Sequence, residues 1–121
     1  MPLREYIERP HVRVLVLDKK RDVIDDAFEA RGYQRKIALD VPHFSVVPLV
    51  VQRTDFIATV SKRLAMTYAS FVAIDVLTPP LKMPRLAIKM SWHERTEHEP
   101  ACRFLRSIVR ESLAATRATR S

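Results

Sequence analysis

Glycine and cysteine are almost absent from this chain of 121 residues, in which Gly32 and Cys102 are the only members of their kinds. Walker-type and dinucleotide-binding loops need several glycines, because only glycine lets the backbone approach a phosphate group closely. The sequence therefore excludes the common Gly-rich nucleotide-binding loops. A single cysteine excludes an internal disulfide framework and suits the reducing environment of a cytoplasm.

Long apolar runs are missing as well, because Arg, Lys or Asp interrupts each apolar stretch before it reaches the length of a membrane span. The first five residues, Met-Pro-Leu-Arg-Glu, lack the apolar stretch of a signal peptide. The composition, 47% apolar and 29% charged, is typical of a soluble globular protein. The length suits one compact domain. We therefore expect a cytoplasmic protein with no membrane contact.

The positive charge of the chain is concentrated near its C-terminus. The net charge is +7, and residues 101–121 hold five arginines against one glutamate, which is a net +4 and leaves +3 for the first hundred residues. A basic tail differs from a groove-reading face with interleaved aromatic residues. The sequence also shows neither a helix-turn-helix pattern nor zinc-finger spacing. We expect no specific DNA contact from the residues of this chain.

His93, His98 and Cys102 invite a metal-binding or catalytic interpretation, since His98 and Cys102 are four positions apart. A zinc site needs three or four converging ligands and groups that orient them, whereas the two histidines lie in a segment rich in glutamate. The pattern places no base beside Cys102, so a cysteine nucleophile is also unsupported. We expect no metal, no cofactor and no enzymatic activity.

Apolar, β-branched segments alternate with short helical patterns over the first eighty residues. The expected helices cover 3–8, 22–31, 45–52 and 62–68, and the expected strands cover 11–17, 36–41, 56–60 and 71–77. Pro10 biases Arg9 out of the first helix, Gly32 suits a helix end, and Ser61 suits a helix N-cap. Strands that alternate with helices predict an α/β fold with a mostly parallel sheet flanked by helices.

The last quarter of the chain has a different pattern. Leu86, Ile88, Met90 and Trp92 alternate with small or polar residues, which predicts a strand with one apolar face. Pro100 suits the first position of a following helix. The expected apolar stripe of that helix comprises Phe104, Leu105, Ile108, Val109 and Leu113. On its far side, Arg103, Arg106 and Arg110 are expected in solvent or, in a longer protein, against DNA or an acidic partner.

The segment 41–61 points most directly to function, because a polar loop with His43 and Ser45 separates a strand from a helix there. In a parallel sheet this position is the carboxyl edge, where open α/β sheets bind small molecules. His43 is interpreted as a hydrogen-bonding contact to a ligand carboxylate or phenol, or as a solvated capping residue. Ser45 and the free N–H groups of the following helix would favour an anion.

Three of four further candidate residues have two interpretations each. Phe44 is a core anchor, which its place after a buried strand favours, or a stacking platform. His11 begins a strand and faces either edge of the sheet. Thr59 and Ser61 follow the strand at 56–60 and would line the wall of a cleft, although a plain N-cap explains Ser61 as well.

Short motifs follow one another in a fixed order from about residue 3 to residue 110. They are Pro10-His11-Val12, Val41-Pro42-His43-Phe44, the segments 54–60 and 62–65, Pro79-Pro80, Trp92-His93, and the segments 99–101 and 104–106. By these motifs and their spacing, the chain resembles the effector-binding region of LysR-type transcriptional regulators. Within that family it is most similar to the regulators of nodulation and aromatic catabolism.

The resemblance implies a periplasmic-binding-protein-like fold for most of the chain. Residues 1–80 would form the second effector-binding subdomain, 81–113 a return crossover with the closing strand and helix of the first subdomain, and 114–121 a disordered basic tail. The implied effector-binding residues are His43, Phe44, Ser45, His11 and Thr59. Relatives often place small residues near 18–22, so an anion-binding turn there would depend on Lys19, Lys20 and Arg21 instead.

Two functional hypotheses follow. In the first, the chain is the ligand-sensing fragment of a LysR-type regulator, binds a small aromatic or carboxylate inducer, and controls transcription through a helix-turn-helix domain absent from this chain. In the second, it is a standalone α/β interaction protein that modulates full-length regulators by hetero- or homodimerisation. The apolar strand and helix of the last quarter cover each other only partly, which predicts a homodimer.

Overall fold

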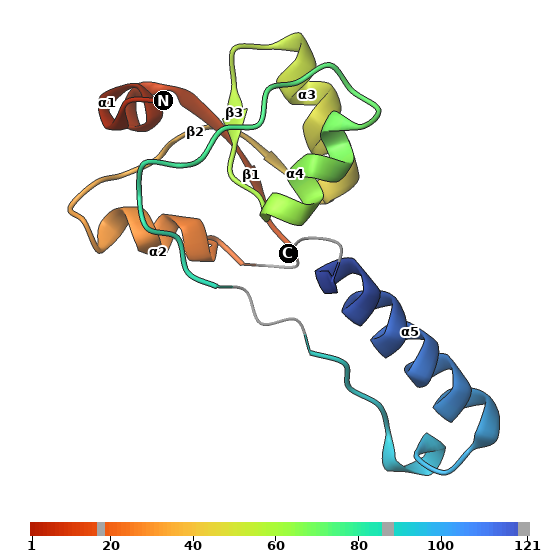
Figure 1. Ribbon diagram of the computed structural model, residues 1–121. Coiled ribbons are helices and arrows are strands. Elements are labelled where there is room, and N and C mark those ends of the chain that lie inside the picture. Colours follow the sequence, from red (N-terminus) through yellow and green to blue (C-terminus); the bar gives the residue numbers. More distant parts are fainter. Residues whose placement is uncertain (17–18, 86–88, 119–121) are drawn as a thin grey trace. The chain divides into compact units, whose positions relative to one another are not determined.

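The computed structural model describes residues 1–16, 19–85 and 89–118, and for 116–118 it describes the backbone alone. The chain forms two compact units, Met1–Leu86 and Ala87–Ser121 (Figure 1). The first unit contains strands and short helices, and the second is built around one long helix.

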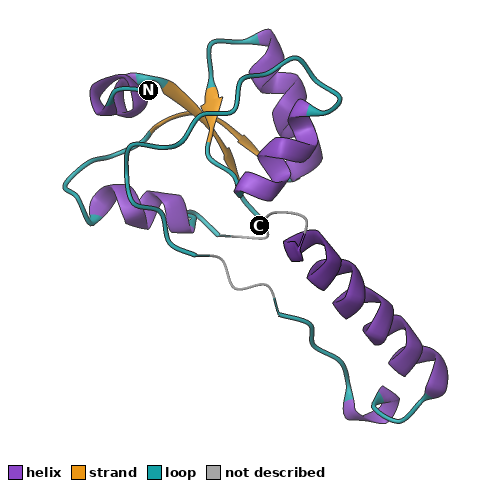
Figure 2. Ribbon diagram, viewed as in Figure 1, coloured by secondary structure: helices purple, strands orange, loops and turns teal. Residues whose placement is uncertain are grey.

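A three-stranded parallel sheet organises the described part of the first unit, in the order β2-β1-β3 (Figure 2). The strands are β1 (Pro10–Val14), β2 (Lys36–Val41) and β3 (Ile57–Ala58). Both outer strands run parallel to β1, which confirms the predicted α/β class with a parallel sheet. Because parallel strands end at a common edge, the segments after Val41 and Ala58 leave the sheet at the same edge.

Short helices precede, connect and follow these strands. They are α1 (Leu3–Glu8), α2 (Val23–Glu29), the 3-10 turn η1 (Phe44–Val46) with α3 (Val47–Arg53), and α4 (Lys62–Ala69). Asp22 and Asp25 form a reciprocal capping box at the start of α2, and Ser61 Oγ accepts the Leu64 N–H at the start of α4. Gly32 follows α2 with a φ of +77°, which glycine adopts without steric cost. The predicted roles of Gly32 and Ser61 at helix ends are confirmed.

Two apolar clusters form the core of the first unit. Val12 and Val41 of the sheet pack with Val47 of α3 and Tyr68 of α4 in the first cluster. The second cluster joins Tyr6 of α1, Phe28 of α2 and Leu81. Burying an apolar side chain of this kind stabilises a fold by roughly 1.5–3 kcal/mol. The clusters therefore fix the helices against the sheet and, through Leu81, hold the segment that follows α4.

Residues 71–77 were predicted to form a fourth strand, and that prediction is wrong. The segment has no strand conformation. Its described backbone bonds are local turns, such as Ile74 N–H to Val72 O, and Phe71 and Leu77 are exposed. An apolar, β-branched sequence supplies strand propensity, but a strand also needs a partner to complete its ladder. The neighbouring strand β3 offers only two residues, and Pro79 and Pro80 have no N–H to donate.

The second unit contains the 3-10 turn η2 (Glu94–Thr96) and α5 (Pro100–Ala118). Pro100 is the first residue of α5, as predicted. The helix continues through 114–118, which corrects the disorder expected for that stretch, because alanine has the highest helix propensity and three of these five residues are alanine. Residues 119–121 lie outside the described residues. No helix in the described ranges is both long and apolar enough to cross a membrane.

Trp92 packs on the arginine side of α5 instead of its apolar side. The guanidinium of Arg106 lies 4.6 Å from the centre of the Trp92 ring and that of Arg110 lies 5.7 Å away. Arg106 also donates hydrogen bonds to the carbonyls of Thr96 and Glu97. The expected solvated position is therefore wrong for Arg106, because its planar cation stacks on an aromatic ring and caps a turn.

The strand predicted at 86–92 is not formed in its described part. Leu86 and Ile88 lie outside the described residues, and residues 89–92 have no strand conformation. The apolar stripe of α5 is accordingly left exposed, with Phe104 at 67% and Leu105 at 62% exposure and with Ile108 and Val109 also accessible.

Candidate ligand-binding site

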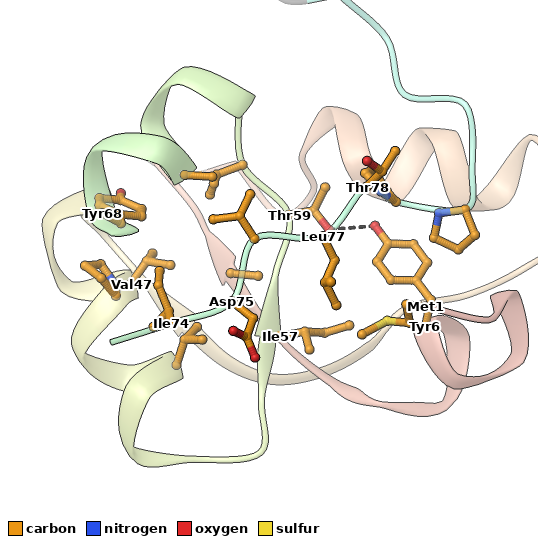
Figure 3. A pocket seen from close by; sticks show the side chains of 18 residues that line it. Met1, Tyr6, Val47, Ile57, Thr59, Tyr68, Ile74, Asp75, Leu77 and Thr78 are labelled. Carbon is orange, nitrogen blue, oxygen red and sulfur yellow. Dashed lines mark hydrogen bonds between the residues drawn. The ribbon is translucent and has the colours of Figure 1, made fainter. Parts of the chain in front are cut away.

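A partly enclosed cavity of about 140 Å³ lies beside the carboxyl end of β3, within the first unit (Figure 3). Its walls come from separate parts of the chain: Met1, Tyr6 of α1, residues 57–60, the helices α3 and α4, and the segment 74–80. Most of the lining side chains are apolar. The position matches the sheet edge at which the sequence predicted a small-molecule site.

Two hydroxyl groups in this cavity wall are hydrogen-bonded to each other, and Asp75 and Thr78 add further polar groups to the lining. The Tyr6 Oη and Thr59 Oγ1 atoms are 2.6 Å apart and share a hydrogen bond (Figure 3). Burial raises the pKa of Tyr6 above its ordinary value, so the phenol stays protonated at neutral pH. The wall therefore carries a neutral pair that can both donate and accept a hydrogen bond.

Tyr68 connects the cavity to the loop after β2. Its ring lines the cavity, and its hydroxyl donates a hydrogen bond of 2.5 Å to the carbonyl of Phe44 in η1. Burial raises the pKa of Tyr68, so this donor is retained at neutral pH. A displacement of the loop would therefore move Tyr68 in the cavity wall, and a displacement of Tyr68 would move the loop.

His43, Phe44 and Ser45 lie together in that loop, at the start of η1, and all three are exposed. His43 makes no capping hydrogen bond there. Phe44 is 45% exposed, so the interpretation as a core anchor is wrong: Val41 and Val47, on either side of the turn, fill the core instead. Of the five predicted effector-binding residues, Thr59 lines the cavity, and these three lie at the sheet edge outside its lining.

The start of α3 offers few free N–H groups to an anion. The Val47 N–H already bonds to the Phe44 carbonyl, and Pro48, in the first turn of α3, has no N–H. The anion site predicted at Ser45 and the start of the following helix therefore has two fewer backbone N–H donors than expected. The missed signal was in the sequence, since a proline in the first helical turn always removes one donor.

His11, the fifth predicted residue, is completely buried behind Tyr6. Its Nε2–H donates to the Tyr6 carbonyl over 2.8 Å, and its ring makes edge contacts with the rings of Tyr6 and Phe28. Its Nδ1 has no hydrogen-bond partner among the described residues. Burial lowers the pKa of His11, so the ring is neutral at physiological pH. His11 is placed to hold Tyr6, and a direct contact with a ligand would require Tyr6 or Phe28 to move.

Comparisons with known proteins agree with this fold. No family model matches the chain. The transcriptional activator NagR of Ralstonia sp is 32% identical over 111 residues, which are 92% of this chain and 37% of that protein. The activator NahR of Pseudomonas putida is 33% identical over 90% of this chain and 36% of its own length. Nodulation protein D 3 of Rhizobium leguminosarum bv. phaseoli is 27% identical over 91% of this chain.

The solved structures show which part of such regulators this chain resembles. The regulatory domain of MexT, a transcriptional activator in Pseudomonas aeruginosa, superposes with a TM-score of 0.78 at 29% identity, over 90% of this chain and 55% of that chain. The homologues of this chain are LysR-type regulators. The predicted resemblance to a LysR effector-binding domain is thereby confirmed. The chain spans slightly more than a third of the length of the curated LysR-type relatives above.

Charged side chains at and after Arg21 are engaged with one another. Arg21 pairs with Asp26 and Glu29, and the side chain of Arg35, 1% exposed, lies 2.6 Å from Asp22 and 2.7 Å from Asp25. Burial raises the pKa of Asp25, but hydrogen bonds from the Asp22 N–H, Arg35 and Arg13 outweigh it and hold that pKa below its ordinary value. Arg21 therefore serves the fold, while Lys19 and Lys20 are exposed and Asp18 lies outside the described residues.

The sequence did not single out Tyr6, Tyr68 or the segment 74–80 as parts of a site. Tyr6 and Tyr68 are lone aromatic residues on short helices, and only their hydrogen bonds to Thr59 and Phe44 bring them into the site. Among the described residues, His93, His98 and Cys102 form no metal-binding group, since nowhere there do three His, Cys, Asp or Glu side chains converge.

Proposed function

We propose that this chain is the effector-sensing part of a LysR-type transcriptional regulator and that its effector occupies the cavity beside β3. One observation carries the proposal: the hydroxyl pair of Tyr6 and Thr59 lies in the wall of a mostly apolar cavity at a sheet edge. Small-molecule sites are typically concave and apolar with a few placed polar groups. In open α/β sheets they lie at the carboxyl ends of the strands.

The way in which the cavity is built suggests how binding would be communicated. One wall is the sheet with α3 and α4, and another is the segment 74–80, which has no strand partner in the described structure. A ligand that contacts both walls would favour conformations in which 74–80 is held against the sheet. A ligand shifts a conformational equilibrium only by its difference in affinity for the two states, so this segment is the element on which the effector would act.

The exposed loop at the same sheet edge would add to effector recognition. His43 and Ser45 present an imidazole and a hydroxyl there, and the Tyr68–Phe44 hydrogen bond links the loop to the cavity wall. Effector contact through His43, Phe44 and Ser45, together with Thr59 in the cavity, is part of the proposal. The effector would be a small aromatic or carboxylate compound.

In the complete regulator, control of transcription would require a DNA-binding helix-turn-helix domain that this chain does not contain. The chain itself would act in the cytoplasm, as a homodimer, and would change the geometry of the attached DNA-binding domains when the effector binds.

A ligand screen on the 121-residue chain tests the proposal. A ligand at 100 times its dissociation constant stabilises a protein by about 2.7 kcal/mol, so simple phenols and aromatic acids are compared by thermal shift. A compound that stabilises the wild type should lose most of its effect with Thr59→Val. Thr67→Val is the matched control, because Thr67 is exposed on α4 and its hydroxyl donates to the Arg63 carbonyl, outside the cavity lining. If no compound in either class raises the melting temperature, the proposal fails.

The exposed apolar stripe of α5 favours a second candidate function. A contiguous apolar surface on a folded unit commonly marks a protein contact, and Phe104, Leu105, Ile108 and Val109 form such a surface here. In this alternative the chain is a standalone interaction protein that pairs with full-length LysR-type regulators and modulates them. Titration of the chain into a purified full-length relative, followed by light scattering, should then show a mixed complex at a defined stoichiometry.

A further inference from the structure

We propose that the cavity beside β3 takes one neutral aromatic ring with a hydroxyl group, that is, a simple phenol, and discriminates against aromatic carboxylates. This inference rests on the proposed function and narrows the ligand of the same site. The size of the cavity, the charge of its lining and the hydrogen-bonding capacity of the Tyr6–Thr59 pair support it.

The size of the cavity matches one ring. Its volume is about 140 Å³, and an apolar protein cavity of about 150 Å³ stays dry and binds benzene. Val47, Val51, Ile57 and Ile74 supply apolar contact surface from three different segments. A flat ring in contact with all of them would gain dispersion and desolvation energy without a change in the sheet.

The charge of the lining argues against an anion. No lysine, arginine or histidine lines the cavity, whereas Asp75 does. A carboxylate placed there would find no cationic side chain in the described lining and would lie near an acidic side chain (Figure 3). Burial of an unpaired charge is costly. The nearest helix start does not compensate, because the Val47 N–H is already engaged and Pro48 has none.

The hydroxyl pair selects among neutral rings. Tyr6 and Thr59 each carry one hydroxyl hydrogen, and their mutual hydrogen bond uses one of the two. The second hydrogen and the free lone pairs remain available to a ligand hydroxyl. Because burial keeps Tyr6 protonated, this capacity persists at neutral pH. Phenol therefore gains one hydrogen bond that toluene, a ring of similar size, does not.

The test is a calorimetric titration of the full chain at pH 7 with phenol, toluene and benzoate. We expect phenol to bind saturably, toluene to bind roughly three- to tenfold more weakly, and benzoate to bind at least about tenfold more weakly than phenol. Equal or tighter binding of benzoate would overturn the proposal.

Two variants locate the binding. Ala65→Met fills the cavity from α4 and should abolish phenol binding, whereas Ala69→Met on the exposed side of the same helix should not change it. Should Ala65→Met fail to fold, the double variant Tyr6→Phe with Thr59→Val decides the matter, because it removes both hydroxyls of the pair and should remove the preference for phenol over toluene while toluene still binds. Phenol binding that persists in folded Ala65→Met, or a preference that persists in the double variant, contradicts the assignment.

The outcomes also separate this inference from the proposed function. If benzoate binds, and His43→Ala but not Ala65→Met abolishes that binding, the phenol assignment fails while ligand sensing at the sheet edge stands. If none of the three compounds binds, the phenol assignment fails, and the thermal-shift screen with other phenols and aromatic acids then decides the proposed function separately.

Discussion

The guanidinium of Arg106 lies 4.6 Å above the ring of Trp92, so an arginine and not an apolar residue of α5 holds the one tryptophan of the chain. The cation also closes the turn before α5 through the carbonyls of Thr96 and Glu97. The two faces of α5 therefore have different roles. The arginine face contacts Trp92 and the turn before the helix, and the apolar face exposes Phe104 and Leu105 to solvent.

Arg106→Ala should release Trp92 from α5. Loss of a cation–π contact costs about 0.5–1 kcal/mol at an accessible site, and the emission maximum of the tryptophan should move to longer wavelength as its ring becomes wetter. Arg103→Ala is the control, since Arg103 is exposed on the same helix and does not contact the ring in the described structure. An unchanged emission spectrum for Arg106→Ala would show that the contact does not persist in solution.

Ile108→Asp should weaken self-association of the chain. Ile108 lies in the exposed apolar stripe of α5, and a charge at the centre of an apolar contact is left without a partner. Multi-angle light scattering should show a dimer for the wild type and a monomer for the variant. Ser107→Asp places the same charge one position away, outside the stripe, and should remain dimeric. A wild-type monomer at high concentration would contradict the prediction.

Arg35→Met should destabilise the first unit strongly. The Arg35 side chain is 1% exposed and neutralises Asp22 and Asp25, so its removal leaves two carboxylates close together. Loss of one partner from a buried ion pair typically costs about 3–5 kcal/mol. Arg21→Met, which removes an exposed partner of Asp26 and Glu29, should cost less than about 1 kcal/mol. Urea denaturation curves of the two variants measure the difference.

Stability should fall as the pH is lowered from 7 to 5 because of His11. Burial lowers the pKa of His11 in the folded state, so below pH about 6.5 the unfolded chain binds a proton that the folded chain does not. Arg35 also disfavours the charged ring, while Asp22 and Asp25 favour it. His11→Gln, which keeps an N–H donor, should flatten this pH dependence. His43→Gln alters an exposed histidine and should leave the slope unchanged.

Features with local signals were predictable from the sequence. Gly32, Ser61 and Pro100 mark helix ends through backbone and capping preferences that operate within one turn. The alternation of apolar segments with helices was enough to predict a parallel sheet. Thr59 directly follows β3 and lines the cavity, while its contact with an effector stays a prediction.

Features that depend on distant partners were not predictable in the same way. The Tyr6–Thr59 hydrogen bond joins residues 53 positions apart, and the Tyr68–Phe44 bond joins residues 24 apart. No periodicity encodes such pairs. Trp92 was assigned to an apolar strand face because alternation was the only available cue, whereas an indole ring is also a good surface for arginine. The segment 71–77 had strand propensity, but propensity alone does not supply a pairing partner.

The parallel arrangement of the sheet has a kinetic consequence. His11 and Val12 of β1 pair with both β2 and β3, which are distant in sequence from β1 and from each other. Contacts of this kind require the closure of long loops before any pairing energy is gained, and they slow folding. During refolding, α2 and α4, whose contacts are local, should form before β1 is enclosed. Until β1 is enclosed, the partly folded chain would expose the apolar edge of this central strand. Aggregation is most favourable at that stage.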